Sequence, residues 1–139
     1  MSEGDTDHLP LLLLVEDEPL IRTSLAAALE DSGYALAEAD NAEQAIAHLD
    51  SEKTFVGVIT DIRLGAGRTG WEVARHARQS SAGIAVVYMT GDSAADWTAE
   101  GVPNSVLLQK PFATAQVTIA ISTLLNAADI SPTQPLPGA

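Results

Sequence analysis

Five side chains with metal-binding or reactive groups stand at or near the ends of apolar runs in this sequence. In chain order they are Glu16, Asp17, Asp61, Thr90 and Lys110. Each one alone has an ordinary explanation in turn chemistry, strand propensity or solvation of a lysine. Three carboxylates placed together are different, because like charges raise one another's pKa unless a cation lies near them. The set therefore predicts a cation site if the fold brings these residues together.

The types of these side chains favour Mg²⁺ as the cation. One or two carboxylates plus water molecules are the ligands that Mg²⁺ takes in proteins, and Lys110 would add positive charge from the opposite side. A site that combines Mg²⁺, an ammonium and a hydroxyl is suited to stabilising phosphoryl oxygens. A carboxylate in the middle of such a site can act as a nucleophile. The residue types thus indicate phosphoryl transfer.

The hydrophobic pattern predicts the elements that must position these groups. Apolar runs predict strands at Leu11–Val15, Ala35–Ala39, 55–60, 84–89 and 106–108. Helices are expected to start at Pro19 and Asn41 and to span 71–78, 94–99 and 113–125. Strands that alternate with helices form a parallel sheet covered on both faces, because parallel neighbours need crossover connections. Ligands of such doubly wound α/β folds bind beyond the carboxyl ends of the strands, where the five side chains would meet.

The first two helices carry signals at their ends. Pro19 suits the start of the first helix and Gly33 its end, and Asn41 followed by Gln44 resembles a capping box. Apolar and small residues at helical spacing indicate the inward face of the first helix, namely Leu20, Ile21, Ser24, Leu25, Ala28 and Leu29.

Composition limits the classes of function. The 139 residues contain 19 acids against 7 lysines and arginines, and the formal charge of −12 disfavours nucleic acid and membrane surfaces as partners. Cysteine is absent, which excludes disulfides and thiol chemistry. The acidic start and the lack of long apolar segments lead us to expect a cytoplasmic protein. Flexible tails are expected at 1–8 and 127–139, around a folded domain at 9–126.

Four segments resemble the signature motifs of the receiver domain of bacterial two-component response regulators. They are LLLLVEDEPLIR, VITDIRL, VVYMTGD and LLQKPF, and they follow the order of the family within residues 11–125. The resemblance implies a flavodoxin-like fold, with a five-stranded sheet of order 2-1-3-4-5 and five helices. It also implies a stand-alone, single-domain response regulator that uses Mg²⁺. A sensor histidine kinase or a histidine phosphotransfer protein would donate the phosphoryl group.

The resemblance assigns roles to individual positions. Asp61 matches the phospho-acceptor, Asp17 the acid that binds Mg²⁺ directly, and Glu16 an acidic neighbour that acts through water. Arg63 stands where the family uses a main-chain carbonyl as a further metal ligand. Thr90 matches the switch hydroxyl, which moves to a phosphoryl oxygen.

Two further positions follow the family and one departs from it. Lys110 matches the ammonium that pairs with a phosphoryl oxygen, and its bond to Pro111 matches the family's cis peptide. Leu107 stands where many receivers have a tyrosine or phenylalanine that moves with the switch hydroxyl. We therefore expect activation to order or shift residues 91–105, where Trp97 is either a core residue or an exposed partner contact.

Three functional alternatives are open at this point. Phosphorylation could switch protein contacts on the fourth helix, fifth strand and fifth helix, or the protein could be a phosphate sink or relay intermediate without output. In both cases it would be a monomer or weak dimer, and no enzyme beyond promoting its own phosphorylation and dephosphorylation. A phosphohydrolase of the haloacid dehalogenase type also combines Asp, Thr, Lys and Mg²⁺. Its nucleophile, however, follows an early strand in a DxD motif, whereas Arg63 stands two residues after Asp61.

Overall fold

Five parallel strands form one sheet with helices on both faces. The computed structural model describes residues 9–65, 67–91 and 97–129. The strands are β1 (Leu11–Val15), β2 (Ala35–Ala39), β3 (Gly57–Asp61), β4 (Ala85–Thr90) and β5 (Ser105–Gln109). The helices are α1 (Pro19–Asp31), α2 (Ala42–Leu49), α3 (Gly70–Ser80), α4 (Trp97–Glu100) and α5 (Thr114–Asp129). The strand order is β2-β1-β3-β4-β5 and every pairing is parallel, which confirms the expected fold.

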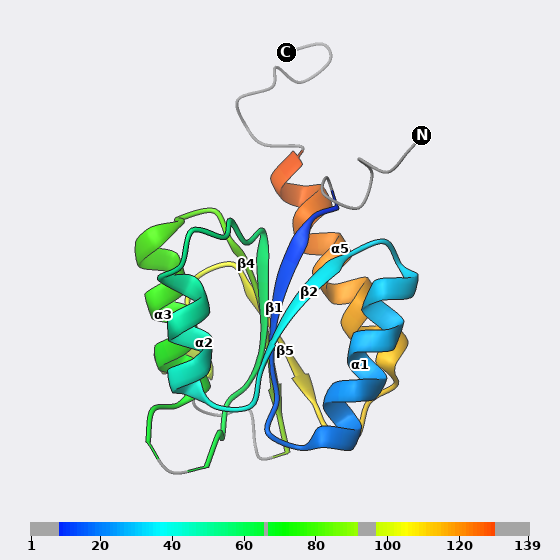
Figure 1. Cartoon of the computed structure of the whole chain (residues 1–139), viewed down its shortest axis with the longest axis horizontal. Coiled ribbons are helices and arrows are strands. Elements are labelled where there is room, and N and C mark those ends of the chain that lie inside the picture. Colours follow the sequence, from blue (N-terminus) through cyan, green and yellow to red (C-terminus); the bar gives the residue numbers. More distant parts are fainter. Residues whose placement is uncertain (1–8, 66, 92–96, 130–139) are drawn as a thin grey trace.

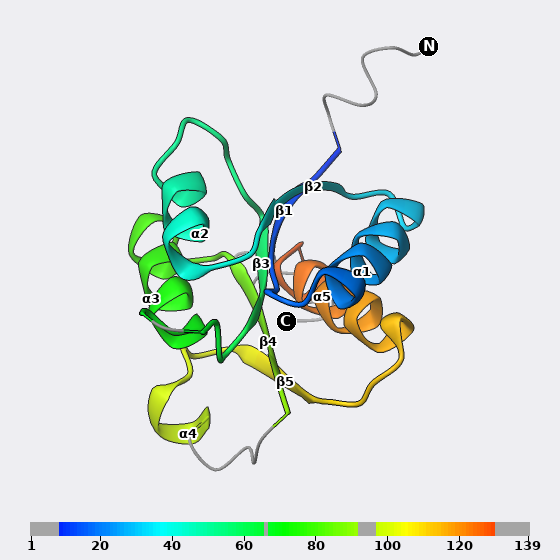
Figure 2. The same cartoon turned by 60° about the horizontal axis from the view of Figure 1, so that its bottom comes forward.

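Two helical layers enclose the sheet. Helices α1 and α5 cover one face, and α2 and α3 cover the other (Figure 1). Strands β3 and β4 are buried along their whole length, as apolar runs covered on both sides should be. Successive residues point to opposite faces, so Tyr88 belongs to the apolar cluster under α2 and α3, and Met89 to the cluster under α1 and α5. The short α4 lies on the α3 side of the sheet (Figure 2), where Trp97 packs against the first of these clusters.

The residues at the start of α2 and after the end of α1 have the features expected of helix caps. The Asn41 side chain accepts a hydrogen bond from the Gln44 amide at 2.8 Å, as expected. The Gln44 side chain accepts from the Asp40 amide, one residue earlier than a capping box requires. Gly33 follows the last turn of α1 with a φ of +99°, a conformation that glycine adopts without strain. The expected helix ends are therefore confirmed, apart from the partner of the Gln44 side chain.

Strands β3, β4 and β5 each end one residue later than the apolar run that predicted them, while β3 and β4 begin at Gly57 and Ala85 and not at 55 and 84. Strand β3 includes Asp61, which pairs with Met89, and β4 includes Thr90, which pairs with Gln109. Backbone hydrogen bonds continue the ladder through these polar residues. A pattern of apolar side chains cannot reveal such bonds. Two of the candidate site residues are thus held in the sheet itself and not in the following loops.

Other differences concern the helices. Helix α5 continues to Asp129, so residues 127–129 are helical and not part of a tail, while 1–8 and 130–139 lie outside the described residues. The fourth helix is described only over α4, since part of the expected 94–99 lies outside the described residues. Leu20 and Ser24, both expected on the inward face of α1, are exposed, and Leu20 has 79% of its surface accessible. None of the helices in the described part of the chain has the length and apolar character that crossing a membrane would require.

Candidate functional site

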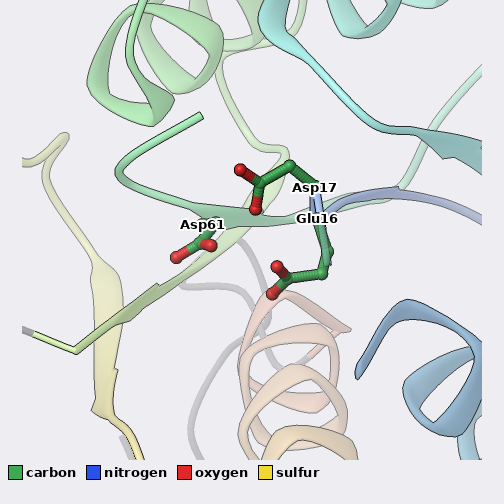
Figure 3. Close-up of side chains that lie close together, drawn as sticks. All are labelled: Glu16, Asp17 and Asp61. Carbon is green, nitrogen blue, oxygen red and sulfur yellow. The ribbon is translucent and has the colours of Figure 1, made fainter. Parts of the chain in front are cut away.

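The carboxyl ends of β1 and β3 bring three carboxylates together. Glu16 and Asp17 directly follow β1, and Asp61 is the last residue of β3. One carboxylate oxygen of each lies within 4.8 Å of the others, and Figure 3 shows the three side chains gathered at this edge of the sheet. Glu16 and Asp61 are buried, with 0% and 6% of their surface exposed, whereas Asp17 is exposed. The structure thus places the expected cation ligands in one group.

The ammonium of Lys110, which follows β5, also lies in this group. Lys110 Nζ lies 3.1 Å from Asp61 Oδ2 and 3.3 Å from Glu16 Oε1, and donates a hydrogen bond to each. Its backbone amide donates to the Thr90 carbonyl at 2.7 Å, which continues the β4–β5 ladder by one residue. The peptide bond between Lys110 and Pro111 is cis, as expected. Lys110 therefore reaches the acidic group from a backbone that is fixed against β4.

Glu16 is an acid that burial keeps from ionising easily. The pKa of the Glu16 carboxyl is raised from 4.5 to about 7, mainly by burial and also by the charge of Asp61. The Glu18 amide, which donates to Glu16 Oε2 at 3.0 Å, and the Lys110 ammonium both act in the opposite direction. The Arg22 guanidinium donates to the Glu16 carbonyl at 2.8 Å and fixes the backbone at this point. Glu16 is thus rigidly held and easily protonated at this edge.

The pair of Asp61 and Lys110 balances burial against charge. Burial raises the pKa of the Asp61 carboxyl, although the neighbouring ammonium opposes that shift. Burial alone would lower the pKa of Lys110, but the charges and hydrogen bonds of Asp61 and Glu16 outweigh it, and the pKa is raised. Lys110 is therefore a cation when it faces Asp61.

The backbone of Asp61 is held on three sides. The Thr60 hydroxyl donates to the Asp61 carbonyl at 2.8 Å, and the amide of Ile62 donates to the Met89 carbonyl at 3.0 Å. Gly70, the first residue of α3, donates its amide to the Ile62 carbonyl at 2.8 Å. A Cβ at Gly70 would lie 2.1 Å from the Asp61 carbonyl oxygen, so only glycine fits there. This close contact sets the position of the acidic side chain.

The start of α3 was not anticipated from the sequence as a part of the site. Thr69 accepts from the Glu72 amide while the Glu72 side chain accepts from the Thr69 amide, which makes a capping box. The spacing Thr-x-x-Glu at 69–72 was the signal that could have revealed it. This cap fixes the first turn of α3, and with it the contact between Gly70 and Asp61.

The remaining expected site residues lie around this group. Thr90 is buried at the end of β4, one position beyond Met89, the register partner of Asp61. The Arg63 side chain is exposed in the loop after β3, and the metal-binding role of its carbonyl stays a prediction. Pro111 is exposed beside Lys110.

The two residues expected at the switch surface are both partly buried. Leu107 lies in β5 directly beside Tyr88 of β4, and packs against the apolar cluster under α2 and α3. Trp97 packs against the same cluster and donates its indole hydrogen to Ser105 Oγ at 3.0 Å. Trp97 is therefore a packing residue that keeps part of its surface exposed. The sequence reasoning did not single out Tyr88, which lies between these residues and α3.

The acidic group has the properties of a magnesium site. All its ligands are carboxylate oxygens, the hard donors that Mg²⁺ prefers. Of the described residues in this group, one ammonium stands against three carboxylates, so an excess of negative charge is left when all three are ionised. Burial makes the ionised form of Glu16 unfavourable, and a divalent cation beside it would offset that cost. Glu16, Asp17 and Asp61 are the side chains that would hold the ion.

An apolar cavity adjoins the acidic group on the side of α1. It has a volume of about 710 Å³, and Leu20, Ile21 and Leu25 line one wall. Further lining residues come from the segment after β5 and include Lys110 and Phe112.

Comparison with known proteins identifies the family. Residues 12–122 match the family model for the response regulator receiver domain. This chain belongs to that family. Receiver domains bind Mg²⁺ at an acidic pocket and are phosphorylated by histidine kinases.

Three relatives show how this receiver domain compares. A response regulator receiver protein from Sinorhizobium medicae WSM419 is 38% identical, with a TM-score of 0.84, covering 86% of this chain and 97% of that one. The alginate biosynthesis transcriptional regulatory protein AlgB from Pseudomonas syringae pv. tomato is 30% identical over 93% of this chain, which spans 29% of that protein. The receiver domain of a sensor histidine kinase from Pseudomonas aeruginosa PAO1 was solved with a magnesium ion in its active site cleft. Its 21% identity and TM-score of 0.73, over 85% of this chain and 98% of that one, show the fold alone.

Proposed function

We propose that this receiver domain accepts a phosphoryl group on Asp61 from a phosphohistidine, and that the modification switches its contacts with other proteins. The donor is a sensor histidine kinase or a histidine phosphotransfer protein. The observation that carries the proposal is the position of Asp61, buried at a strand end between the Lys110 ammonium and the carboxylates of Glu16 and Asp17. Membership of the family supports the same role.

The chain's own groups suit an in-line transfer. A carboxylate oxygen of Asp61 forms a bond to phosphorus while the bond from phosphorus to the histidine nitrogen breaks, and the imidazole leaves. Lys110, already 3.1 Å from Asp61 Oδ2, pairs with a phosphoryl oxygen. Thr90, at the end of the neighbouring strand, is the hydroxyl that turns toward another. Water later hydrolyses the acyl phosphate, and we expect the protein to promote only its own phosphorylation and dephosphorylation.

Mg²⁺ is the proposed cofactor. Held by Glu16, Asp17 and Asp61, with the Arg63 carbonyl as a further ligand, it would neutralise charge on the phosphoryl oxygens. The magnesium ion in the cleft of the Pseudomonas aeruginosa receiver domain supports this assignment, and so does the all-carboxylate donor set of this chain.

The apolar cavity beside Lys110 supports a protein as the phosphodonor. Leu20 lines this cavity and exposes 79% of its surface. An amphipathic helix of the donor would bury Leu20 and bring its phosphohistidine to Asp61. The charge of −12 makes nucleic acid and membrane surfaces poor partners, and we place the protein in the cytoplasm as a monomer or weak dimer.

Output through protein contacts and service as a phosphate sink both follow from the same chemistry. We favour output through α4, β5 and α5, because Trp97 and Leu107 are only partly buried there. The match to the receiver family speaks against the phosphohydrolase alternative. The sink or relay role differs only in lacking a partner for the phosphorylated form.

The decisive experiment is intact-mass measurement after incubation with acetyl phosphate and Mg²⁺. We expect the wild-type protein to gain one phosphoryl group and Asp61→Asn to gain none. Asp31→Asn is the matched control, because Asp31 is an exposed acid at the end of α1, away from the acidic group. If neither acetyl phosphate nor phosphoramidate gives an Asp61-dependent adduct, the proposal is wrong.

A further inference from the structure

Tyr88 is an aromatic residue in the middle of the sheet with no surface exposed. It lies on β4 and points into the layer of α2 and α3. Thr90 stands two residues further along the same strand, and therefore on the same face. Leu107 of β5 is the register partner of Tyr88, so the two side chains lie next to each other. The aromatic ring that β5 lacks at Leu107 is thus present on the neighbouring strand.

The hydroxyl of Tyr88 holds the connection between α4 and β5. The buried Val102 amide donates to the Tyr88 hydroxyl oxygen at 3.1 Å. The Val102 carbonyl accepts from Ser105 Oγ at 2.7 Å, and Ser105 in turn accepts from the Trp97 indole. Burial raises the pKa of the Tyr88 hydroxyl, which therefore stays neutral. One phenol oxygen thus links β4 to a hydrogen-bonded chain that ends at Trp97 on α4.

The ring of Tyr88 contacts α3, the helix whose first residue lies against Asp61. The rings of Trp71 and Tyr88 lie 4.7 Å apart between centroids, at an interplanar angle of 60°. Trp71 directly follows Gly70, whose backbone fits against the Asp61 carbonyl without room for a Cβ. A shift of the Asp61 backbone must therefore move the start of α3, and with it the ring of Trp71.

We propose that Tyr88 is the positioning residue that couples Asp61 to the connection between α4 and β5. Its ring moves when Trp71 moves, and its hydroxyl then moves the Val102 amide, to which it is hydrogen-bonded. This inference rests on the proposed function and adds the route by which phosphorylation reaches the output surface. Two contacts in series carry the change, and each joins packed or hydrogen-bonded groups that the structure shows. The coupling aromatic of this chain stands on β4 rather than on β5.

The two tryptophans of the chain give a direct test. Trp71 contacts the ring of Tyr88, and Trp97 lies at the end of the hydrogen-bonded chain that starts at the Tyr88 hydroxyl. The experiment records the indole and backbone amide signals by ¹H–¹⁵N NMR, with and without beryllofluoride and Mg²⁺ as a phosphoryl mimic. In the wild type we expect both indole signals and the amide signals of Gly101, Val102, Asn104 and Ser105 to shift. In Tyr88→Phe we expect the Trp71 signal to shift while the Trp97 signal and these amides do not. The Val102 amide should also exchange with solvent about fivefold faster, because its hydrogen bond is lost.

Tyr34→Phe is the matched control. Tyr34 also makes a hydroxyl hydrogen bond, to Ser122 Oγ at 2.7 Å, but in the cluster under α1 and α5. Tyr34→Phe should respond to the mimic as the wild type does, and both variants should form the acetyl phosphate adduct to a similar extent. The inference is overturned if the Trp97 signal of Tyr88→Phe moves as far as in the wild type, or if it stays fixed in the wild type.

A second measurement keeps the test independent of the variant's folding. The chain has two tyrosines, so 3-fluorotyrosine labelling of the wild type gives two ¹⁹F signals. The Tyr88 signal should move with the mimic and the Tyr34 signal should not, and equal responses of the two would overturn the inference. Loss of the adduct in the wild type would instead reject the proposed function itself.

Discussion

The backbone of Gly70 lies so close to Asp61 that a Cβ would stand 2.1 Å from the Asp61 carbonyl oxygen. Its amide also donates to the Ile62 carbonyl at 2.8 Å, so helix and strand end are in direct contact. The position of the candidate acceptor therefore depends on a residue that has no side chain and acts through its backbone alone.

Gly70→Ala is expected to lower the free energy of unfolding by about 1–3 kcal/mol, because neither backbone can yield without breaking its hydrogen bonds. Phosphorylation of Asp61 should slow as well. Urea unfolding measures the first effect. Gly83→Ala is the control, since a Cβ there meets nothing within 4 Å, and an equal loss in both variants would contradict the steric explanation.

Glu16 should make the metal-free protein less stable as the pH rises. Its pKa is about 7 in the folded chain against an ordinary 4.5, so the folded state binds the proton more tightly than the unfolded state does. The resulting stability is fully present below pH 4.5 and is lost as the pH rises through about 7. Glu16→Gln should flatten this part of the profile in urea unfolding with a chelator present. Asp61 is shifted in the same direction and should keep a remaining slope. Parallel profiles for wild type and variant would argue against a raised pKa of Glu16.

Mg²⁺ should stabilise the protein, and more at pH 8 than at pH 5.5, because the ligating carboxylates must first lose their protons. Thermal unfolding with Mg²⁺ or with a chelator measures this difference. Asp17→Asn should remove most of the stabilisation, since Asp17 offers one of the three ligand oxygens, while Asp31→Asn should retain it. Equal stabilisation in both variants would place the ion elsewhere.

Lys110→Gln should bind Mg²⁺ more tightly than the wild type, by about threefold to tenfold, because an ammonium that repels the cation is gone. The same change should slow phosphorylation by acetyl phosphate, since a phosphoryl oxygen loses its partner. Isothermal titration and intact mass measure the two effects. Lys53→Gln, at the other and exposed lysine, should change neither. Weaker Mg²⁺ binding in Lys110→Gln would show that the lysine helps to assemble the site.

Arg78→Lys should loosen the segment between α4 and β5. The Arg78 guanidinium donates to the carbonyls of Ile84 at 2.8 Å, Pro103 at 2.6 Å and Asn104 at 3.5 Å. An ammonium cannot reach all three, so we expect a loss of about 1–2 kcal/mol in urea unfolding. Arg75→Lys, at an exposed ion pair with Glu100, should lose about half a kcal/mol or less. A larger loss for Arg75→Lys would reverse this ranking.

Local sequence patterns predicted most of the fold because they repeat. The apolar runs of β1, β3 and β4 are long enough to identify buried strands, and their alternation with helices leaves few possible topologies. The carboxyl ends of β3 and β4 were each missed by one residue, since Asp61 and Thr90 belong to the ladder through backbone hydrogen bonds. Leu20 was misplaced on the inward face of α1, because a helical period cannot tell where the sheet beneath a helix ends.

By itself the sequence determined which groups would meet, because parallel strands deliver their carboxyl ends to one edge whatever the details of packing. Glu16, Asp17, Asp61 and Lys110 are readable in this way from type and position. Only the tertiary structure decided how the edge is connected to the rest of the molecule. The contact between Gly70 and Asp61, and the bond between Tyr88 and Val102, join residues with no shared local pattern. Such contacts depend on how closely two backbones approach, and that distance is set by the packing of the whole core.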